Sequence, residues 1–461
     1  RKSETMSVVG RSMDDLPPPI VVEILSWVGD SADLARCRLA STTLRSLSYD
    51  VRAVRLVCSH DRLLRSRAAA GTPPPAAPFR SLVPNLLPLL RHLESLSLAA
   101  EESSSADPCE VDESDDLHLT AVSFVSRWLP AAGGRLRSLS ISDLWAQSCW
   151  RPSEVMALIS NCCDRLLNLE LRNAWLYALD LAPMPSLASL TLEVIRLEYD
   201  DDLDRLCACF PSLESLSLIR VGGLCKPSIR LPRLKTCRWT VTDAPTSVAI
   251  DAPNLIDLDL RCVSPGVLSL RTPSLRRLRL RMKRVRTVQV GGLPHLRSLR
   301  VEASSGLRDL ILALPVCEAV EEAEVEAPAC ADGSLDLPEP VGVGDLVRAF
   351  PCLDELGLGP GAWRELERSA ARGGTGPPSG WRCVRRLAVH LPRPPLCWAV
   401  ASFSPVLGLC SPLCEVAVHV HEDDAGEAME RLVSTCRSSF PEVRWRWGLW
   451  RECFEGTLLG V

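Results

Sequence analysis

The sequence contains few aromatic residues and few histidines, and it carries no recognisable catalytic motif. Phe, Trp and Tyr make up 5% of the 461 residues, and the 7 histidines are scattered along the chain. Neither a Gly-x-Ser-x-Gly motif nor a phosphate-binding loop is present, and the 20 cysteines do not show the paired spacing of a zinc site. Gly357-Leu-Gly359-Pro-Gly361 lacks the acidic residue that follows a dinucleotide fingerprint and is typical of a repeat turn. We therefore expect no enzymatic activity, no cofactor and no metal site.

Long hydrophobic runs are also lacking, and we expect no secretory leader. No apolar stretch reaches the length of about 18 residues that a membrane span needs, and the first residues, Arg1-Lys-Ser-Glu-Thr-Met6, are polar. We expect free, mostly buried thiols in a reducing compartment, the cytoplasm or the nucleus, and no membrane partner. The net charge of −5 gives no general attraction to nucleic acid.

The chain does contain a recurring phrase, apolar-x-x-apolar-x-apolar, often introduced by proline. It is clearest at Leu187/Leu190/Leu192 and Leu213/Leu216/Leu218. It returns at Leu234/Cys237/Trp239, Leu255/Leu258/Leu260, Leu275/Leu278/Leu280 and Leu296/Leu299/Val301. From Leu213 onward its first positions are 21, 21, 20 and 21 residues apart. A fixed period near 20 residues predicts a solenoid, in which each unit buries its apolar face against its neighbours.

The units differ in length, which predicts an α/β solenoid of mixed repeats. Early units leave room for helices at 117–130 and 152–166, and late units for helices at about 395–410 and 424–439. The central units are too short for a helix and instead carry a second alternating run, which indicates a second strand. These runs are Ile229/Leu231, Val248/Ile250, Leu268/Leu270 and Val288/Val290. The acidic, serine-rich stretch 100–116 is expected to be a disordered insertion.

A short helical segment precedes the repeats. Residues 1–12 are expected to be a disordered lead, and Asp14-Asp15-Leu16-Pro17-Pro18-Pro19 is a good helix start. Apolar residues follow at helical spacing in 20–28, 34–39 and 44–47, which predicts three helices. The repeat phrase begins at Val51, so we expect no flexible linker between the two parts.

Residues 13–47 resemble an F-box. They combine a Leu16-Pro17 opening, an Ile24-Leu25 pair and the sequence Leu34-Ala-Arg-Cys-Arg in the second helix. As a whole, the chain is similar to plant F-box/leucine-rich-repeat proteins. This resemblance implies an F-box at 13–50 that docks on the Skp adaptor and, through it, a cullin. It also implies a repeat array at 51–461 that holds a protein substrate for ubiquitination. The implied adaptor contacts are Leu16, Pro17, Ile20, Ile24, Leu25, Leu34, Cys37 and Leu39. Many F-boxes have tryptophan where Leu44 stands, which predicts weaker adaptor binding than is typical.

The repeats also predict where a substrate would bind. Between the inward apolar residues of each phrase, the intervening side chains line the concave strand ladder. Their charges are banded, with the basic run Arg277, Arg279 and Arg281 flanked by acidic rungs. Neighbouring Asp257 and Asp259 neutralise part of this basic run, and the remaining charge favours an acidic partner segment. Our candidate substrate-binding residues are Arg238, Asp257, Asp259, Arg277, Arg279, Arg281 and Arg300. Each of them also fits a solvated ladder of cross-strand pairs.

The leading functional hypothesis is therefore a substrate receptor of a Skp–cullin–F-box ubiquitin ligase. One alternative is a leucine-rich-repeat scaffold or ligand sensor that acts outside any ligase. A receptor for a small hormone-like ligand ranks last, because the sequence places no cluster of aromatic residues on the ladder.

Overall fold

A computed structural model of the chain divides into two compact units. It describes residues 16–28, 31–59, 78–101, 117–143, 151–199, 201–284, 286–328, 339–372, 383–393, 399–408, 410–424 and 426–451. The first unit comprises Arg1–Glu198 with Ala208–Leu213, and the second comprises Tyr199–Cys207 with Glu214–Val461. The expected disordered lead, 1–12, lies outside the described residues. So does most of the expected insertion 100–116, of which residues 100 and 101 are the end of a strand.

The first unit opens with three helices, α1 (Pro18–Ser26), α2 (Ser31–Ala40) and α3 (Thr42–Leu47), followed by the turn η2 (Ser48–Asp50). Prolines occupy the first turn of α1, where a backbone N–H would have no partner in the helix. The hydroxyl of Ser41 caps α3 by accepting hydrogen bonds from the backbone N–H groups of Thr43 and Leu44. Val21, Leu25, Leu34 and Leu44 are buried and form the small core of this helical segment.

The rest of the first unit is a parallel sheet with the order β1-β2-β3-β5-β6, in which β4 also pairs with β5. Its strands are β1 (Ala53–Ser59), β2 (Ser95–Glu101), β3 (Ser138–Ser142), β4 (Pro152–Ser153), β5 (Asn168–Leu176) and β6 (Ser189–Leu197). Its helical elements are α5 (Pro78–Leu86), η3 (Leu87–Leu89), α6 (Val122–Val125), α7 (Leu129–Ala132), η5 (Gly133–Arg135) and α8 (Val155–Cys162). The middle apolar position of each phrase is in register and buried in every strand of the ladder: Val54, Leu96, Leu139, Leu169 and Leu190.

Two predicted helices differ from the observed ones. The stretch 117–130 contains two short helices, α6 and α7, instead of one long helix. Pro130 explains the break, because a proline ring inside a helix clashes with the carbonyl four residues earlier, here that of Ser126. In 152–166 the chain first forms β4 and only then α8.

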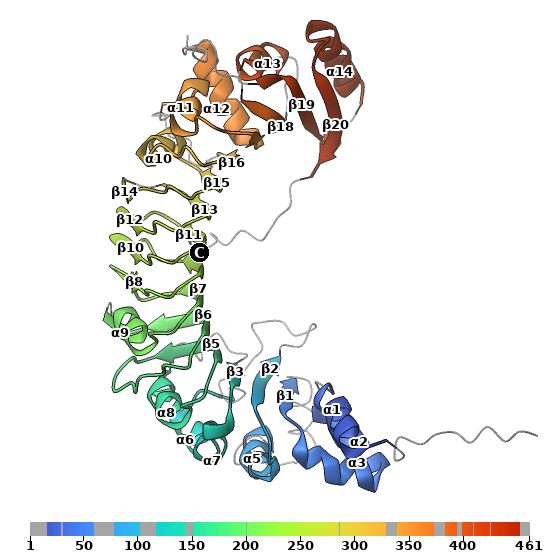
Figure 1. Cartoon of the computed structure of the whole chain (residues 1–461), viewed down its shortest axis with the longest axis vertical. Helices are drawn as coiled ribbons and strands as arrows, with labels where there is room; N and C mark the ends of the chain where they lie inside the picture. The colour runs from blue at the N-terminus through green and yellow to red at the C-terminus, as the bar shows by residue number, and fades with distance from the viewer. Residues whose placement is uncertain are drawn as a thin grey trace, which may run out of the picture. The chain divides into compact units, whose positions relative to one another are not determined.

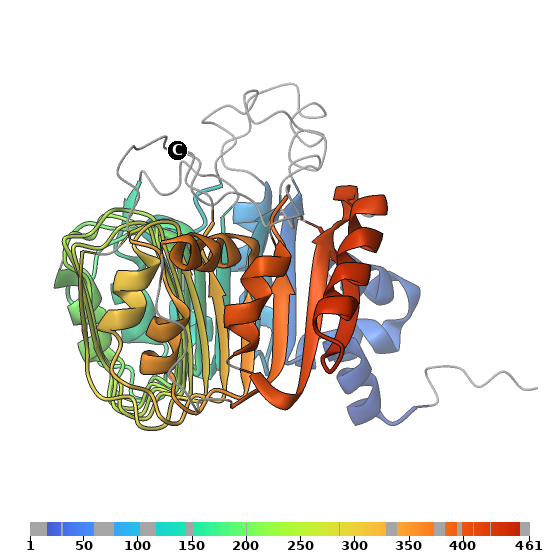
Figure 2. The same cartoon turned by 90° about the horizontal axis from the view of Figure 1, so that it is seen from above.

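The second unit contains a longer parallel sheet with the order β7-β9-β11-β13-β15-β16-β17-β18-β19-β20 (Figure 1). These strands are β7 (Ser215–Val221), β9 (Thr236–Val241), β11 (Asp257–Cys262), β13 (Arg277–Met282), β15 (Ser298–Ala303), β16 (Glu322–Glu326), β17 (Glu355–Leu358), β18 (Val384–His390), β19 (Cys410–His421) and β20 (Arg444–Trp450). Successive turns from β7 to β15 lie over one another when seen from above (Figure 2).

Short second strands alternate with the long ones in the central repeats. They are β8 (Ser228–Arg230), β10 (Ser247–Asp251), β12 (Val267–Arg271) and β14 (Thr287–Val290), and they form a separate four-stranded parallel sheet. From β15 onward helices replace them: α10 (Leu307–Ala313), α11 (Val343–Ala349), α12 (Pro360–Ala371), α13 (Ala399–Leu407) and α14 (Glu427–Ser439), with the turn η8 (Glu422–Asp424). Helix α9 (Asp201–Cys209) lies where the chain passes from one unit to the other.

Strand alternation separates the core of the second unit from its outer surface. Leu258 and Leu260 of β11 are fully buried, and Leu258 pairs in register with Cys237 and Leu278. The intervening residues point outward, so that Asp257 lies between Thr236 and Arg277. We call this outward side the ladder face; it consists of the alternate side chains of the long sheet from Thr236 in β9 to Arg446 in β20. In the described part of the chain, no helix has the length and apolar composition to cross a membrane.

Candidate functional site

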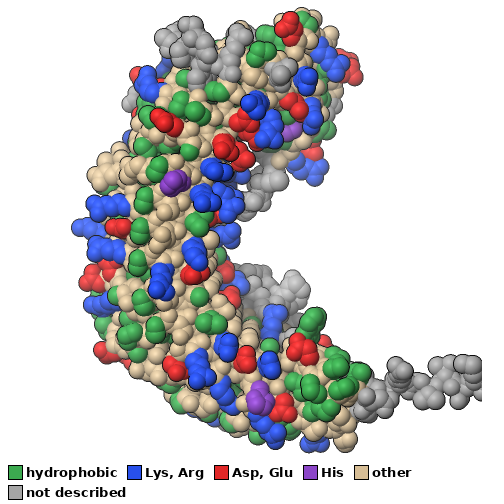
Figure 3. All heavy atoms as spheres, viewed as in Figure 1, with side chains coloured by type: hydrophobic (Ala, Val, Ile, Leu, Met, Phe, Trp, Pro, Cys, Tyr) green, Lys and Arg blue, Asp and Glu red, His purple; other side chains and the backbone are tan. Residues whose placement is uncertain are grey.

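The outer side of α1 carries an exposed apolar stripe. Leu16, Ile20 and Ile24 follow one another at intervals of four residues, and 39%, 49% and 38% of their surfaces are exposed. Trp27, three residues further on, is 82% exposed. This spacing places Ile20, Ile24 and Trp27 on one side of the helix, and Leu16 lies just before the helix begins at Pro18. Hydrophobic side chains gather over this end of the chain (Figure 3). A contiguous exposed apolar patch of this kind is typical of a protein-binding surface.

Contacts within the segment hold the stripe in place. The guanidinium group of Arg38 in α2 donates a hydrogen bond of 2.7 Å to the hydroxyl of Tyr49 and lies 4.5 Å from the centre of its ring. The hydroxyl of Ser26 at the end of α1 accepts a hydrogen bond from the backbone N–H of Arg52, just before β1. The helices are thereby tied directly to the first strand of the sheet in this unit.

The predicted adaptor contacts fall into two groups. Leu16, Pro17, Ile20, Ile24 and Leu39 are exposed, and Cys37 is partly exposed. Leu25 and Leu34 are only 2% and 7% exposed. As part of the core of the helical segment, these two leucines support the surface from beneath and present almost none of their own area to a partner. Sequence reasoning missed Trp27, although its position seven residues after Ile20 was a readable signal.

The ladder face of the second unit is a network of cross-strand ion pairs. Asp257 pairs with Arg277 at 2.9 Å. One carboxylate oxygen of Asp259 lies 3.7 Å from Arg238 and the other lies 3.5 Å from Arg261. Asp259 is only 8% exposed, so its charge is balanced from two sides where water has little access.

The pairing continues along the sheet. Arg281 pairs with Glu302 at 2.7 Å, and Arg300 pairs with Glu324 at 3.2 Å. Two further pairs, Arg386 with Glu355 and Arg446 with Glu415, connect the last strands. Since each such exposed pair contributes only ~0–1 kcal/mol, the network mainly fixes side-chain positions and balances charge.

These pairs correct part of the sequence prediction. The prediction counted only Asp257 and Asp259 as groups that neutralise the arginines of β13, but Glu302 of the next strand neutralises Arg281. Of the seven candidate residues, Arg238, Asp257, Asp259, Arg277, Arg281 and Arg300 all have an ionic partner. Arg279 has no ionic or hydrogen-bonding partner within the described ranges. Ion pairs therefore neutralise the two ends of the basic run, Arg277 and Arg281, whereas the charge of Arg279 in its middle is not neutralised by a described residue.

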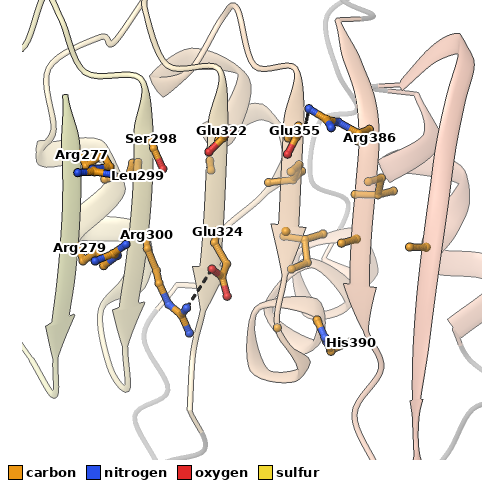
Figure 4. Close-up of a pocket in the computed structure, with 18 of the residues that line it drawn as sticks. Arg277, Arg279, Ser298, Leu299, Arg300, Glu322, Glu324, Glu355, Arg386 and His390 are labelled. Carbon is orange, nitrogen blue, oxygen red and sulfur yellow. Dashed lines mark ion pairs between the residues drawn. The ribbon is translucent and has the colours of Figure 1, made fainter. Parts of the chain in front are cut away.

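A cavity of about 500 Å³ lies on the ladder face between β13 and β19 (Figure 4). Its lining includes Gly357, Ala388 and Ala417, which have little or no side chain on three consecutive strands. Larger side chains surround them, among them Arg279, Arg300, Glu322, Glu324, Glu355, Arg386 and His390. The hollow exists because small residues interrupt a row that is elsewhere made of long charged side chains.

Glu326 lies at the end of β16, where its carboxylate is partly buried and bound by backbone N–H groups. Its carboxylate accepts hydrogen bonds of 3.0 Å from the backbone N–H groups of Ala327 and Gly361. A side chain at Gly359 would collide with this carboxylate, and one at Gly361 would collide with the carbonyl oxygen of Ala327. Burial raises the pKa of Glu326 to about 7, because the charged form loses hydration, and Glu302 and Glu324 add to the effect.

We expect the raised pKa of Glu326 to make stability depend on pH. Its folded pKa lies above its unfolded value of about 4.3, so the folded state binds the additional proton. The contribution of this group to the free energy of unfolding therefore falls as pH rises from 5 to 7 and is constant above about pH 8. Thermal melts between pH 5 and 8 should show this fall in wild type and a weaker pH dependence in Glu326→Gln. Equal slopes for the two proteins would show that the carboxyl titrates normally.

Two imidazoles meet on the adjacent strands β18 and β19. Nδ1 of His419 lies 3.0 Å from Nε2 of His390, so one ring donates a hydrogen bond to the other. Burial lowers the pKa of His390, and the charge of His419 lowers it further. The two facing nitrogens do not both carry a proton while this contact is made. No group of three or more metal-ligating side chains comes together among the residues that the structure describes.

An N-terminal helical segment with an exposed apolar stripe, followed by parallel leucine-rich repeats, defines the F-box/leucine-rich-repeat class. The chain is 38% identical over 447 residues to F-box/LRR-repeat protein At4g29420 of Arabidopsis thaliana, a match that spans 95% of this chain and 98% of the relative. It is 30% identical over 138 residues to F-box protein At3g03040 of the same plant, covering 27% of this chain and 29% of that protein. No protein-family model matches the chain. The first match covers nearly the whole of both proteins, so the chain belongs to the plant F-box/LRR-repeat family.

Proposed function

We propose that this chain is the substrate-binding subunit of a Skp–cullin–F-box ubiquitin ligase. In this role the helical segment docks on a Skp-type adaptor, which connects the chain to a cullin. The ladder face holds a protein substrate. The chain performs no chemistry itself and acts in the cytoplasm or the nucleus. It raises the local concentration of a substrate lysine near the ubiquitin-loaded enzyme.

The observation that carries the proposal is the apolar stripe of Leu16, Ile20, Ile24 and Trp27. A helical cap that only closed the repeat array would turn its large apolar residues inward. Here Val21 and Leu25 already fill the core, and the stripe lies on the opposite, solvent-facing side of α1. Large aromatic and aliphatic side chains that are exposed in the free protein are the usual anchors of a protein interface. Family membership supports the assignment of this partner as the adaptor.

The ladder face supports the second half of the proposal. It presents charged side chains from successive strands, and their ion pairs keep them in defined positions. The face therefore selects a protein partner mainly by the pattern of charges that this partner carries.

Co-expression of the full chain with a plant Skp-type adaptor and a cullin tests the proposal. We expect all three proteins to elute together in gel filtration at equal stoichiometry. If the adaptor elutes separately while the chain is folded, the chain is a leucine-rich-repeat scaffold outside the ligase.

A further inference from the structure

Two charged side chains that line the cavity have no partner in the described residues: Arg279 and Glu322. Both are exposed, and neither forms an ion pair or a hydrogen bond within those ranges. Figure 4 shows Arg279 beside Arg300 on one side of the hollow, and Glu322 two strands away from β13. The other charges of the lining include Arg277, Arg300, Glu324, Glu355, Arg386 and Glu415, each of which has an ionic partner.

The ladder explains why these two charges are uncompensated. Arg279 lies in register between Asp259 and Arg300. Both oxygens of Asp259 are already engaged by other arginines, and Arg300 is engaged by Glu324. Glu322 lies between Ser298, which carries no charge, and Glu355, which is paired with Arg386. Each of the two therefore faces a neighbour that cannot neutralise it.

A ligand binds a charged side chain at the lowest energetic cost when that side chain has no ionic partner in the free protein. A ligand that binds a paired arginine must first displace the carboxylate that holds it, and the gain is correspondingly reduced. A ligand that meets Arg279 or Glu322 makes a new charge-assisted hydrogen bond and gives up none. The selective positions of the cavity lining are thus one cation and one anion.

Sheet geometry fixes their separation. Arg279 is on β13 and Glu322 is on β16, with β15 between them. Neighbouring strands are ~4.8 Å apart, so β13 and β16 are separated by roughly 10 Å across the sheet. Glu322 is in register with Ser298 and Arg277, two residues before Arg279, which adds an offset of ~7 Å along the strands and brings the separation to roughly 12 Å. An extended chain advances ~3.3 Å per residue and covers this separation in about four residues, and side chains four positions apart point to the same face of an extended chain.

We propose that the ladder face binds an extended protein segment that carries an acidic and a basic residue four positions apart. The acidic residue pairs with Arg279 and the basic residue pairs with Glu322. The residues beside this pair lie over the shallow floor of Gly357, Ala388 and Ala417. This inference rests on the proposed function, because it names the class of substrate segment that the same face takes.

Selection from a displayed library of random decapeptides on the immobilised full chain tests the inference. Wild type should enrich peptides with an acid and a base four residues apart. Arg279→Glu should enrich two bases at that spacing, and Glu322→Arg should enrich two acids. A synthetic peptide from the wild-type selection should bind Arg279→Glu and Glu322→Arg at least tenfold more weakly than it binds wild type. Arg230→Glu, on the separate four-stranded sheet, is the matched control and should select the wild-type pattern.

Selection without a charge spacing, or the same pattern in all four proteins, would overturn the inference. The same preparations are also tested for adaptor capture. Adaptor capture without the charge pattern refutes only the substrate class. The charge pattern without adaptor capture refutes the proposed function and leaves the binding specificity in place.

Discussion

Replacing Ile20 and Ile24 together by aspartate is expected to abolish adaptor binding while leaving the repeats folded. Ile20 and Ile24 are 49% and 38% exposed in the free chain, and the substitutions leave the fully buried core residues of α1, Val21 and Leu25, in place. In the complex they become buried anchors, each contributing ~2–4 kcal/mol at an interface hot spot. An isothermal titration of the adaptor into the purified chain should show at least a hundredfold loss of affinity, with the melting temperature of the repeats unchanged.

Two control variants make this result specific. Arg45→Ala changes an exposed residue of α3 and should bind the adaptor like wild type. Val21→Asp places a charge in the core of the helical segment and should lose binding by unfolding that segment. Wild-type affinity in the Ile20→Asp/Ile24→Asp protein would refute the assignment of the stripe.

Leu258→Asp is expected to unfold or aggregate the second unit. Leu258 is completely buried between Cys237 and Leu278 on the neighbouring strands. A carboxylate there has no partner, and we expect a loss of more than ~4 kcal/mol, a large part of the stability of a typical domain. Thermal melts and light scattering of the purified protein measure this effect directly.

The adjacent residue gives the matched comparison. Asp257→Ala removes one ion pair on the outer face and should lower the free energy of unfolding by less than ~1 kcal/mol. Similar melting behaviour of the two variants would contradict the inward and outward assignment of β11.

The sequence predicted the parts of the fold that depend on local pattern. The leucine phrases became the buried positions of parallel strands, because strand alternation and a fixed period determine which residues face the core. Helix α12 was missed because Gly359, Pro360 and Gly361 suggested only a turn. In the structure, those glycines leave room for the carboxylate of Glu326 from the neighbouring strand β16.

The site was less predictable because it depends on pairing between distant residues. Glu302 neutralises Arg281, whereas no side chain in the described residues neutralises Arg279. This difference follows from the register of three strands, which no single phrase contains. The burial of Leu25 and Leu34 depends likewise on how three helices pack, whereas the exposure of Ile20 and Ile24 agrees with their helical spacing.

The turnover of captured proteins tests the central claim most directly. Proteins that co-purify with the wild-type chain from plant cells are identified, and their half-lives are measured in cells that express wild type or the Ile20→Asp/Ile24→Asp variant. A ligase receptor requires the captured proteins to accumulate with the variant, while they still bind its ladder face. Equal half-lives with both proteins would contradict the claim and show that the chain binds its partners without directing their degradation.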